Sequence, residues 1–221
     1  NFDGSLLAQK RLLEKFDPAI VDLAGRGPRS RLWADAKTAA AISDTLQRSA
    51  GHHITLLGSG DFHHISALLL KRLTKPFTLI VFDFHPDWDI LPPKLGCGAW
   101  VSRALELPLV QKVLLLGPSS DDLAAPAIYT GNLQALENDR LEIYPYEHGP
   151  TRVLFRKVPA NSSIKIHRRG PAADISWTAL KGKAADVLRA ALRRCTTRSV
   201  YVSIDKDCLA PEHALTNWEQ G

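Results

Sequence analysis

The sequence lacks the features that mark membrane-spanning and disulfide-rich proteins. None of its apolar runs approaches the roughly 20 residues that a helix needs to cross a bilayer, and no signal peptide is visible at its start. Its cysteines are odd in number and scattered, at Cys97, Cys195 and Cys208. A disulfide framework is therefore not expected, and a reducing cytoplasm fits the sequence best.

Methionine is absent altogether, and the chain of 221 residues begins at Asn1. It is therefore open whether the sequence is a fragment. Its length is sufficient for a good hydrophobic core, and 45% hydrophobic with 23% charged residues is ordinary for a globular protein. We expect a single domain over residues 1–221, with its completeness at the C-terminal end left open.

An excess of negative charge is also missing, since the formal net charge is +5. The basic residues are spread along the chain, in clusters such as Arg168-Arg169 and Arg193-Arg194, with few aromatic residues between them. This distribution favours a solvated surface over a nucleic-acid interface. If the charge has a role, it is more suited to attracting a small anionic substrate.

Strands and helices are expected to alternate along the chain. Apolar and β-branched runs predict strands at residues 19–24, 53–57, 77–82, 110–116, 163–167 and 199–204. Helical spacing of apolar residues predicts helices over residues 1–16, 36–49, 65–73, 99–105 and 176–194, the second of them capped by Asp35. Residues 25–31 are expected to form a loop, and residues 168–171 a turn. The alternation is typical of an α/β fold with a mostly parallel sheet.

The stretch LIVFDFHPDWD, residues 79–89, combines a buried strand with a polar cluster. Asp83, His85 and Asp87 are two residues apart, so in an extended chain their side chains point to the same side. Pro86 cannot donate a ladder hydrogen bond, and the regular strand is therefore expected to end near His85. This places the three polar side chains at the carboxyl end of a strand, where open α/β sheets bind their ligands.

Two further strand ends carry acidic or histidine residues. They are GSGDFHH at residues 58–64 and SIDKD at residues 203–207. Parallel strands bring their carboxyl ends to one edge, so the three clusters are expected to meet. Carboxylates gathered there repel one another unless cations compensate. Mixed carboxylate and imidazole ligands suit manganese, iron or zinc, and their number suggests two ions that share bridging aspartates.

The three motifs resemble those of the ureohydrolase family, which includes arginase and agmatinase, within the wider arginase–deacetylase fold. The resemblance covers residues from about 54 to the end. It implies a three-layer α/β/α fold with a central, mostly parallel sheet, and two Mn²⁺ ions with a hydroxide between them. By the same resemblance, one ion is held by His63, Asp83, Asp87 and Asp205, and the other by Asp83, His85, Asp205 and Asp207.

The sequence departs from the family pattern at three places. The first motif has an extra residue, so either His63 or His64 can be the ligand, and His63 needs the smaller shift. Ala210 precedes Pro211 where the family has an aspartate. Cys97-Gly98 stands where arginase-like enzymes have a proton-relaying histidine before a glycine, so the relay is absent or different.

Each candidate residue also has a purely structural interpretation. The acidic clusters can be a buried salt-bridge network, but this would need basic partners, and Lys206 is expected to point to the opposite side. Cys97 is either a nucleophile or a small apolar residue that faces the cleft. The tryptophans near the motifs either form a substrate pocket or belong to the core. The substrate-pocket candidates are Cys97, Trp100, Asn217, Trp218 and Glu219.

The leading hypothesis is a cytoplasmic, binuclear metal-dependent hydrolase that acts on a C–N bond of a guanidino or amide compound through a metal-bound hydroxide. A deacetylase-like amidohydrolase with one metal is a close rival. A second class is a protein with this fold that lacks ureohydrolase activity and binds metal or a small ligand for a regulatory or structural role. We expect a small-molecule substrate, no nucleic acid and no membrane, and a homo-oligomer is common in the family.

Overall fold

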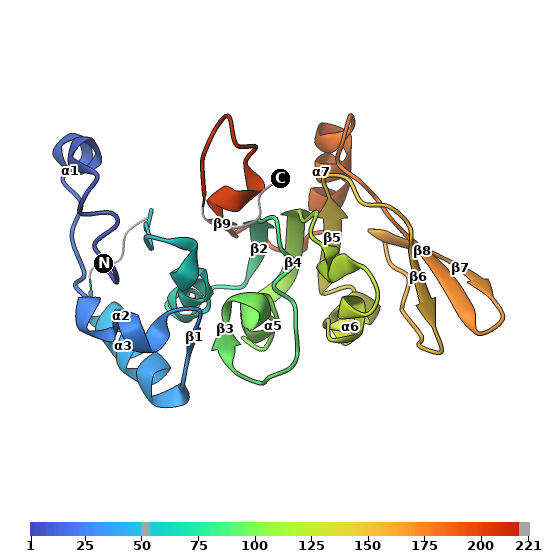
Figure 1. The fold of residues 1–221 in the computed structure, drawn as a ribbon, viewed down its shortest axis with the longest axis horizontal. Helices are drawn as coiled ribbons and strands as arrows, with labels where there is room; N and C mark the ends of the chain where they lie inside the picture. The colour runs from blue at the N-terminus through green and yellow to red at the C-terminus, as the bar shows by residue number, and fades with distance from the viewer. Residues whose placement is uncertain (50–53, 217–221) are drawn as a thin grey trace.

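The computed structural model describes residues 1–49 and 54–216, and a parallel sheet lies at its centre (Figure 1). The sheet has the strand order β5-β4-β2-β9. Val81 of its strand β2 is in register with Leu115 of β4 and Ser203 of β9, and the β2–β4 register shifts only between Phe77 and Thr78. Its strands are β2 (Phe77–Phe82), β4 (Val110–Gly117), β5 (Leu141–Pro145) and β9 (Val200–Ile204).

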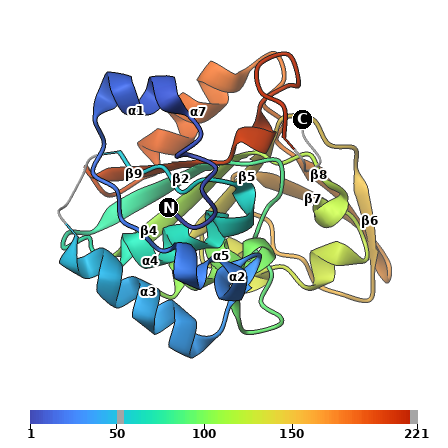
Figure 2. The ribbon, with the colours of Figure 1, turned by 60° about the vertical axis from the view of Figure 1, so that its left-hand side comes forward.

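Both faces of this sheet are covered by helices (Figure 2). Successive strand residues point to opposite sides, so apolar side chains of the same strand pack on both faces. Leu79 and Val81 pack with α4 (Ser66–Leu70) and α5 (Trp100–Leu105) in the largest apolar cluster. Ile80 packs on the opposite face, in a smaller cluster that includes Ala191 of α7 (Ala184–Arg193). Figure 2 shows these helices on the two sides of the sheet.

The N-terminal part of the chain packs beside the sheet through α3 (Ala36–Arg48). Asp35 caps this helix, since its side chain accepts a hydrogen bond from the Thr38 N–H at 2.7 Å. The buried Ile42 of α3 lies in a cluster with Phe62. The other short elements in this part are α1 (Lys10–Phe16), α2 (Gly27–Ser30) and β1 (Trp33–Ala34), which pairs antiparallel with β3 (Leu95–Gly96).

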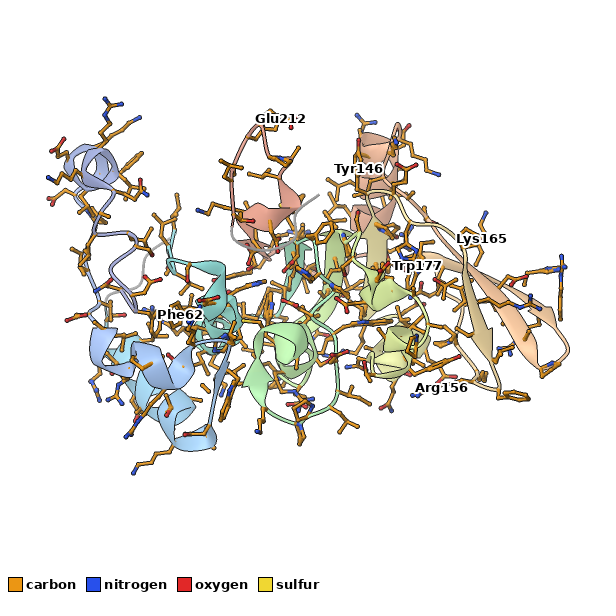
Figure 3. All side chains as sticks on the ribbon, in the orientation of Figure 1. Phe62, Tyr146, Arg156, Lys165, Trp177 and Glu212 are labelled. Carbon is orange, nitrogen blue, oxygen red and sulfur yellow. The ribbon has the colours of Figure 1, made fainter. Side chains whose placement is uncertain are left out.

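A second, antiparallel sheet has the strand order β6-β8-β7. Trp177 of its central strand points toward the middle of the molecule (Figure 3) and packs edge-on against Trp88, with ring centroids 6.4 Å apart. The strands are β6 (Thr151–Leu154), β7 (Ile164–Arg169) and β8 (Ala172–Trp177), and α6 (Leu133–Glu137) lies nearby. The 3₁₀ helices of the described chain are η1 (Ala24–Arg26), η2 (Gly60–Ile65), η3 (Cys97–Ala99), η4 (Asp121–Leu123), η5 (Ala127–Tyr129) and η6 (Lys206–Cys208).

The prediction of an α/β fold with a parallel sheet is confirmed, and so are the central strands, the strand near residues 163–167 and the helices that begin after Asp35 and at Trp100. β2 ends at Phe82, before His85, although the Asp83 N–H still donates to Leu116 O. The helix predicted over residues 65–73 is limited to α4, and the one over residues 1–16 is limited to α1.

Several local predictions were wrong. Residues 19–24 form no strand, because their backbone bonds go to Asn1, as from the Leu23 N–H to Asn1 O. Residues 25–31 contain η1 and α2 in place of a loop, and residues 54–57 form no strand. His53, also assigned to that strand, lies outside the described residues. The helix predicted over residues 176–194 starts only at Ala184, since β8 extends to Trp177, and β7 reaches into the predicted turn at residues 168–171.

The described residues contain no helix long and apolar enough to cross a membrane. Cys97, Cys195 and Cys208 are all free thiols.

Candidate metal centre

The carboxyl ends of β2 and β9 lie side by side and carry the second and third motifs. The Asp205 N–H donates to Phe82 O at 2.9 Å, which aligns the two strand ends. Asp87 has a left-handed backbone conformation (φ 47°), so the chain turns sharply after His85 and brings Asp87 back toward the cluster. The first motif forms η2 and approaches the same edge.

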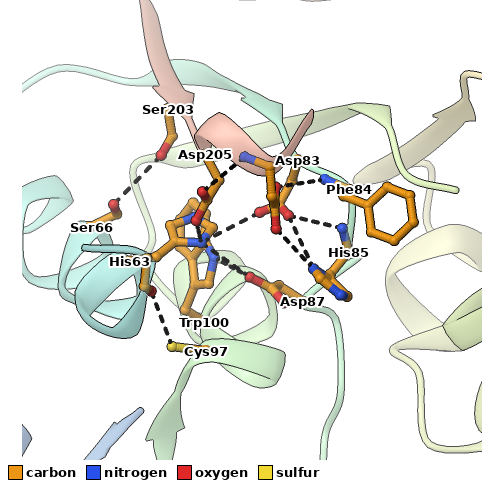
Figure 4. A network of polar contacts seen from close by, with 12 residues as sticks. His63, Ser66, Asp83, Phe84, His85, Asp87, Cys97, Trp100, Ser203 and Asp205 are labelled. Carbon is orange, nitrogen blue, oxygen red and sulfur yellow. Dashed lines mark hydrogen bonds and ion pairs between the residues drawn. The ribbon is translucent and has the colours of Figure 1, made fainter. Parts of the chain in front are cut away.

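His63 is the centre of a first group of ligands (Figure 4). Its Nδ1 lies 3.0 Å from a carboxylate oxygen of Asp205 and 3.4 Å from oxygens of both Asp83 and Asp87. The potential ligand atoms of His63, Asp83 and Asp205 all lie within 4.8 Å of one another. Three separate segments of the chain therefore supply one compact set of nitrogen and oxygen ligands.

A second group is built around His85 and shares Asp83 with the first. His85 Nδ1 lies 3.1 Å from an oxygen of Asp207 and 3.9 Å from an oxygen of Asp83. Asp207 is fixed by the Phe84 N–H, which donates to its Oδ1 at 3.1 Å. Asp83, His85 and Asp207 again satisfy the distances of a metal-binding set. One buried carboxylate thus stands between two candidate positions for a cation.

The electrostatics of the cluster are those of carboxylates crowded away from water. Burial raises the pKa of Asp83 well above its ordinary value, and the neighbouring Asp87, Asp207 and Asp205 raise it further. Burial likewise raises the pKa of Asp87 to about 7, although His63 and His85 oppose the shift. The pKa of Asp205 is lowered despite its burial, because His63 donates a hydrogen bond to it.

The same carboxylates also shift the pKa values of the two histidines. Burial acts to lower the pKa of His63 and His85, but the surrounding carboxylates outweigh it and raise the pKa of both. Within residues 1–49 and 54–216, no lysine or arginine forms an ion pair with the four carboxylates of the cluster. Lys206 is exposed and does not line the cavity of the cluster. Lysine and arginine partners of a buried salt-bridge network are therefore missing from the described residues, and His63 and His85 are the basic groups that contact the four carboxylates.

The residues fit divalent metal ions. Asp83 is only 1% exposed, yet its Oδ2 has no hydrogen-bond partner among the described residues. Buried polar atoms are normally satisfied, and an unsatisfied carboxylate oxygen calls for an ion or a donor. An oxygen-rich set with two imidazoles suits Mn²⁺, and also Fe²⁺ or Zn²⁺.

The two adjacent histidines of the first motif point to different surroundings. His63 faces the carboxylates, whereas the His64 Nδ1 lies 3.4 Å from the Cys97 thiol. A 3₁₀ helix has three residues per turn, so neighbouring side chains of η2 diverge strongly. Burial is the main cause of the low pKa of His64, about 4, and it also raises the pKa of Cys97 to about 12. The pair is therefore neutral at physiological pH.

A cavity of about 200 Å³ opens onto the cluster. Cys97 lines it, as expected, and so does Trp88. Trp100 does not belong to its lining. It is fully buried, donates to Asp87 Oδ2 at 2.8 Å and packs edge-on against His63. The pocket candidates Asn217, Trp218 and Glu219 lie outside the described residues.

Two carboxylates of the cavity wall were missed from the sequence. Asp89 is two residues beyond Asp87, and this continuation of the spacing could have indicated it. Asp122 comes from η4, and no signal in the sequence connects it with the motifs. Both lie on the wall of the cavity without belonging to either ligand group.

The fold and the site define a mixed α/β protein with a candidate metal centre at the edge of its parallel sheet. A protein of Thermotoga maritima described as uncharacterized is 34% identical to this chain over 168 residues. These residues are 76% of this chain and 46% of the relative, so the chain spans about half the length of the protein it matches. No protein-family model matches the chain. No solved structure matches it either.

Proposed function

We propose that this protein is a binuclear metal-dependent hydrolase that acts on a C–N bond of a guanidino or amide compound. The observation that carries the proposal is the position of Asp83, which belongs to both groups of candidate ligands. A shared carboxylate is what two neighbouring ions need. The resemblance of the three motifs to the ureohydrolases agrees with it and implies a three-layer arginase–deacetylase arrangement. The odd number of scattered, free cysteines favours a cytoplasmic location.

Divalent ions bound there would supply Lewis-acid activation of water and of the substrate carbonyl or amidine carbon. The residues of the chain hold the ligands in place. Trp100 donates to Asp87, and backbone N–H groups of Phe84 and His85 donate to Asp207 and Asp83. Such partners fix the orientation of ligating side chains. They leave the ligand set arranged before any ion binds.

Metal content and turnover test the proposal together. The chain is stripped with a chelator, loaded with Mn²⁺, analysed for bound metal, and assayed against guanidino and N-acyl compounds. We expect two ions per chain and hydrolysis of at least one class. Asp83→Asn is expected to abolish both, whereas Asp186→Asn, at an exposed position on α7, leaves both unchanged. A single bound ion with activity would instead indicate a one-metal amidohydrolase.

A second candidate function is metal or ligand binding without ureohydrolase activity, in a regulatory or structural role. The neutral pair of Cys97 and His64 favours it, because a thiol with a pKa of about 12 does not relay protons at neutral pH. Two bound ions without turnover of any compound in the panel would support this candidate and contradict the first.

A further inference from the structure

A second cavity, of about 330 Å³, lies next to the cavity of the candidate metal centre. The two cavities share Asp89, Cys97 and Gly98 in their linings. The two cavities are therefore adjacent along one short segment of chain. Their sizes together fall in the range of ligand pockets, whereas the first cavity alone is small for anything beyond a compact polar group.

The lining of the second cavity differs chemically from that of the first. Its wall outside the shared segment is mainly apolar, with Leu32, Trp33, Leu91 and Pro92. Trp33 is 48% exposed and Leu91 62% exposed, so both have surface left to bury against a ligand. Large apolar side chains gathered around a concave surface are typical of ligand pockets. We call this second cavity the Trp33 groove.

The Trp33 groove is held in shape by the antiparallel pair β1 and β3. Trp33 pairs with Gly96, and a Cβ at Gly96 would lie 3.3 Å from both Leu32 O and Trp33 Cβ, so only glycine allows this close approach without a shift. Leu32 is fixed by hydrogen bonds from its N–H to Asp61 O and from the Cys97 N–H to its own carbonyl. Lys94 Nζ lies 4.4 Å from the centre of the Trp33 ring.

Gly98 lies at the boundary between the two cavities, and its carbonyl accepts a hydrogen bond from the Asp89 N–H at 2.9 Å. A Cβ built on Gly98 would meet Asp89 Oδ2 at 3.8 Å and no other heavy atom of the described residues within 4 Å, apart from its chain neighbours. Asp89 Oδ1 accepts a hydrogen bond from the Thr130 hydroxyl at 2.7 Å, which fixes the carboxylate beside Gly98. A substrate N–H at this point would find an acceptor in Asp89.

From these observations we infer that the substrate has two parts, a guanidino or acylamino head at the metal centre and an apolar, aromatic or branched-alkyl tail in the Trp33 groove. The inference rests on the proposed function and adds the chemical class of the substrate. The linker passes over Gly98, with its N–H facing Asp89. Lys94 beside Trp33 disfavours a positive charge on the tail, because like charges repel.

Two hydroxamic acids test this inference, because the hydroxamate group chelates metal ions and the chain behind it can be varied. Binding of acetohydroxamate and of 4-phenylbutanohydroxamate to the Mn²⁺-loaded chain is measured by calorimetry. We expect the longer compound to bind at least about tenfold more tightly, since its tail buries apolar surface. In Trp33→Ala this advantage should fall to about threefold or less, with the affinity for acetohydroxamate unchanged.

Tyr146→Ala is the matched control, because Tyr146 is an aromatic residue of similar exposure that lines neither cavity. It should keep the full advantage of the longer compound. Equal affinities of the two compounds for the unaltered chain, or an advantage that survives Trp33→Ala, would overturn the inference while leaving the metal centre intact. Failure of both compounds to bind in the presence of Mn²⁺ would instead overturn the metal centre, and the two-part substrate with it.

Discussion

Two buried clusters of charged side chains lie on the same parallel sheet, and they differ in how their charge is compensated. The Asp83 cluster, with Asp87, Asp205, Asp207 and two histidines, stands at the carboxyl ends of β2 and β9. The Glu142 cluster lies within the sheet. There, Glu142 of β5 is fully buried and contacts Lys112 Nζ at 2.7 Å and Arg194 Nη2 at 2.8 Å.

The two clusters shift carboxyl pKa values in opposite directions. Burial acts to raise the pKa of Glu142, but hydrogen bonds from Arg194, Lys112 and Tyr144 outweigh it and lower the pKa. Burial also acts to raise the pKa of Asp83, and there the neighbouring carboxylates of Asp87, Asp207 and Asp205 raise it further. The Glu142 cluster contains its own lysine and arginine partners, whereas the carboxylates of the Asp83 cluster contact only His63 and His85 among the basic groups of the described residues, and under the proposed function metal ions compensate their charge. This contrast is the physical basis for expecting a metal at one and not at the other.

The largest expected effect is the loss of stability when the Glu142 cluster is broken. Glu142→Leu leaves the ammonium group of Lys112 buried without its carboxylate, and breaking a buried pair in this way costs about 3–5 kcal/mol. Urea unfolding of the metal-free chain measures it. Glu142→Gln keeps hydrogen-bond acceptors and should lose less. Wild-type stability of Glu142→Leu would show that the cluster contributes nothing.

Removing the shared carboxylate of the Asp83 cluster should not destabilise the metal-free chain, in contrast to Glu142→Leu. Asp83→Asn takes away one of several crowded negative charges, so the free energy of unfolding should stay constant or rise by about 1 kcal/mol. Mn²⁺ affinity should fall at least about 100-fold, which exceeds the effect of removing an outer-shell partner. A strongly destabilised metal-free Asp83→Asn would mean that this cluster, too, is compensated internally.

Acid titration should separate the two clusters further. Since the pKa of Glu142 is lower in the folded than in the unfolded chain, its contribution is fully present above the ordinary value of 4.5. It is lost as the pH falls through the folded pKa. Unfolding free energies of the wild type and Glu142→Gln, measured from pH 7 downward, should therefore converge below about pH 4.5. If the unfolding free energies of the wild type and Glu142→Gln kept a constant difference over that pH range, the lowered pKa of Glu142 would be contradicted.

The smallest effect is expected at an exposed ion pair on α7. Arg189 pairs with Asp186 at 3.0 Å, but both side chains are mainly exposed. Arg189→Ala should therefore change stability by less than about 0.5 kcal/mol. Arg194, which follows the same helix, is bonded to the buried Glu142, and Arg194→Ala should cost clearly more. If Arg189→Ala and Arg194→Ala lowered the free energy of unfolding equally, the burial of Glu142 would not determine how much its ion pair contributes to stability.

The positions of the motifs were predictable because short-range rules determine them. An apolar run and the parallel order of strands suffice to bring the segments that carry Asp83, His85 and Asp205 to one edge. The period-two prediction for their side chains was wrong beyond Phe82, where β2 ends, and Asp87 reaches the cluster through its left-handed backbone conformation. The capped helix after Asp35 follows from equally local chemistry. Motif spacing favoured His63 over His64 only by the smaller shift, because the direction of each side chain depends on the 3₁₀ geometry of η2, which two adjacent histidines in a sequence do not reveal.

In the antiparallel sheet the strand near residues 163–167 was predicted, whereas β6 and β8 were missed. Residues 172–177 begin with two alanines, which are weak strand formers, and β8 exists through pairing with both β6 and β7. Residues 19–24 show the reverse case. Their β-branched residues favour a strand, but their backbone partner is Asn1, and no strand among residues 1–49 and 54–216 pairs with them.

Anomalous diffraction from crystals of this chain grown with Mn²⁺ tests the central claim most directly, because it gives the number, element and position of bound ions at once. The expected result is two manganese peaks on either side of the Asp83 carboxylate, one bonded to His63 and the other to His85. Side chains of His63, His85 and Asp83 that diverge, or a lysine or arginine inserted among the carboxylates in place of metal, would contradict it.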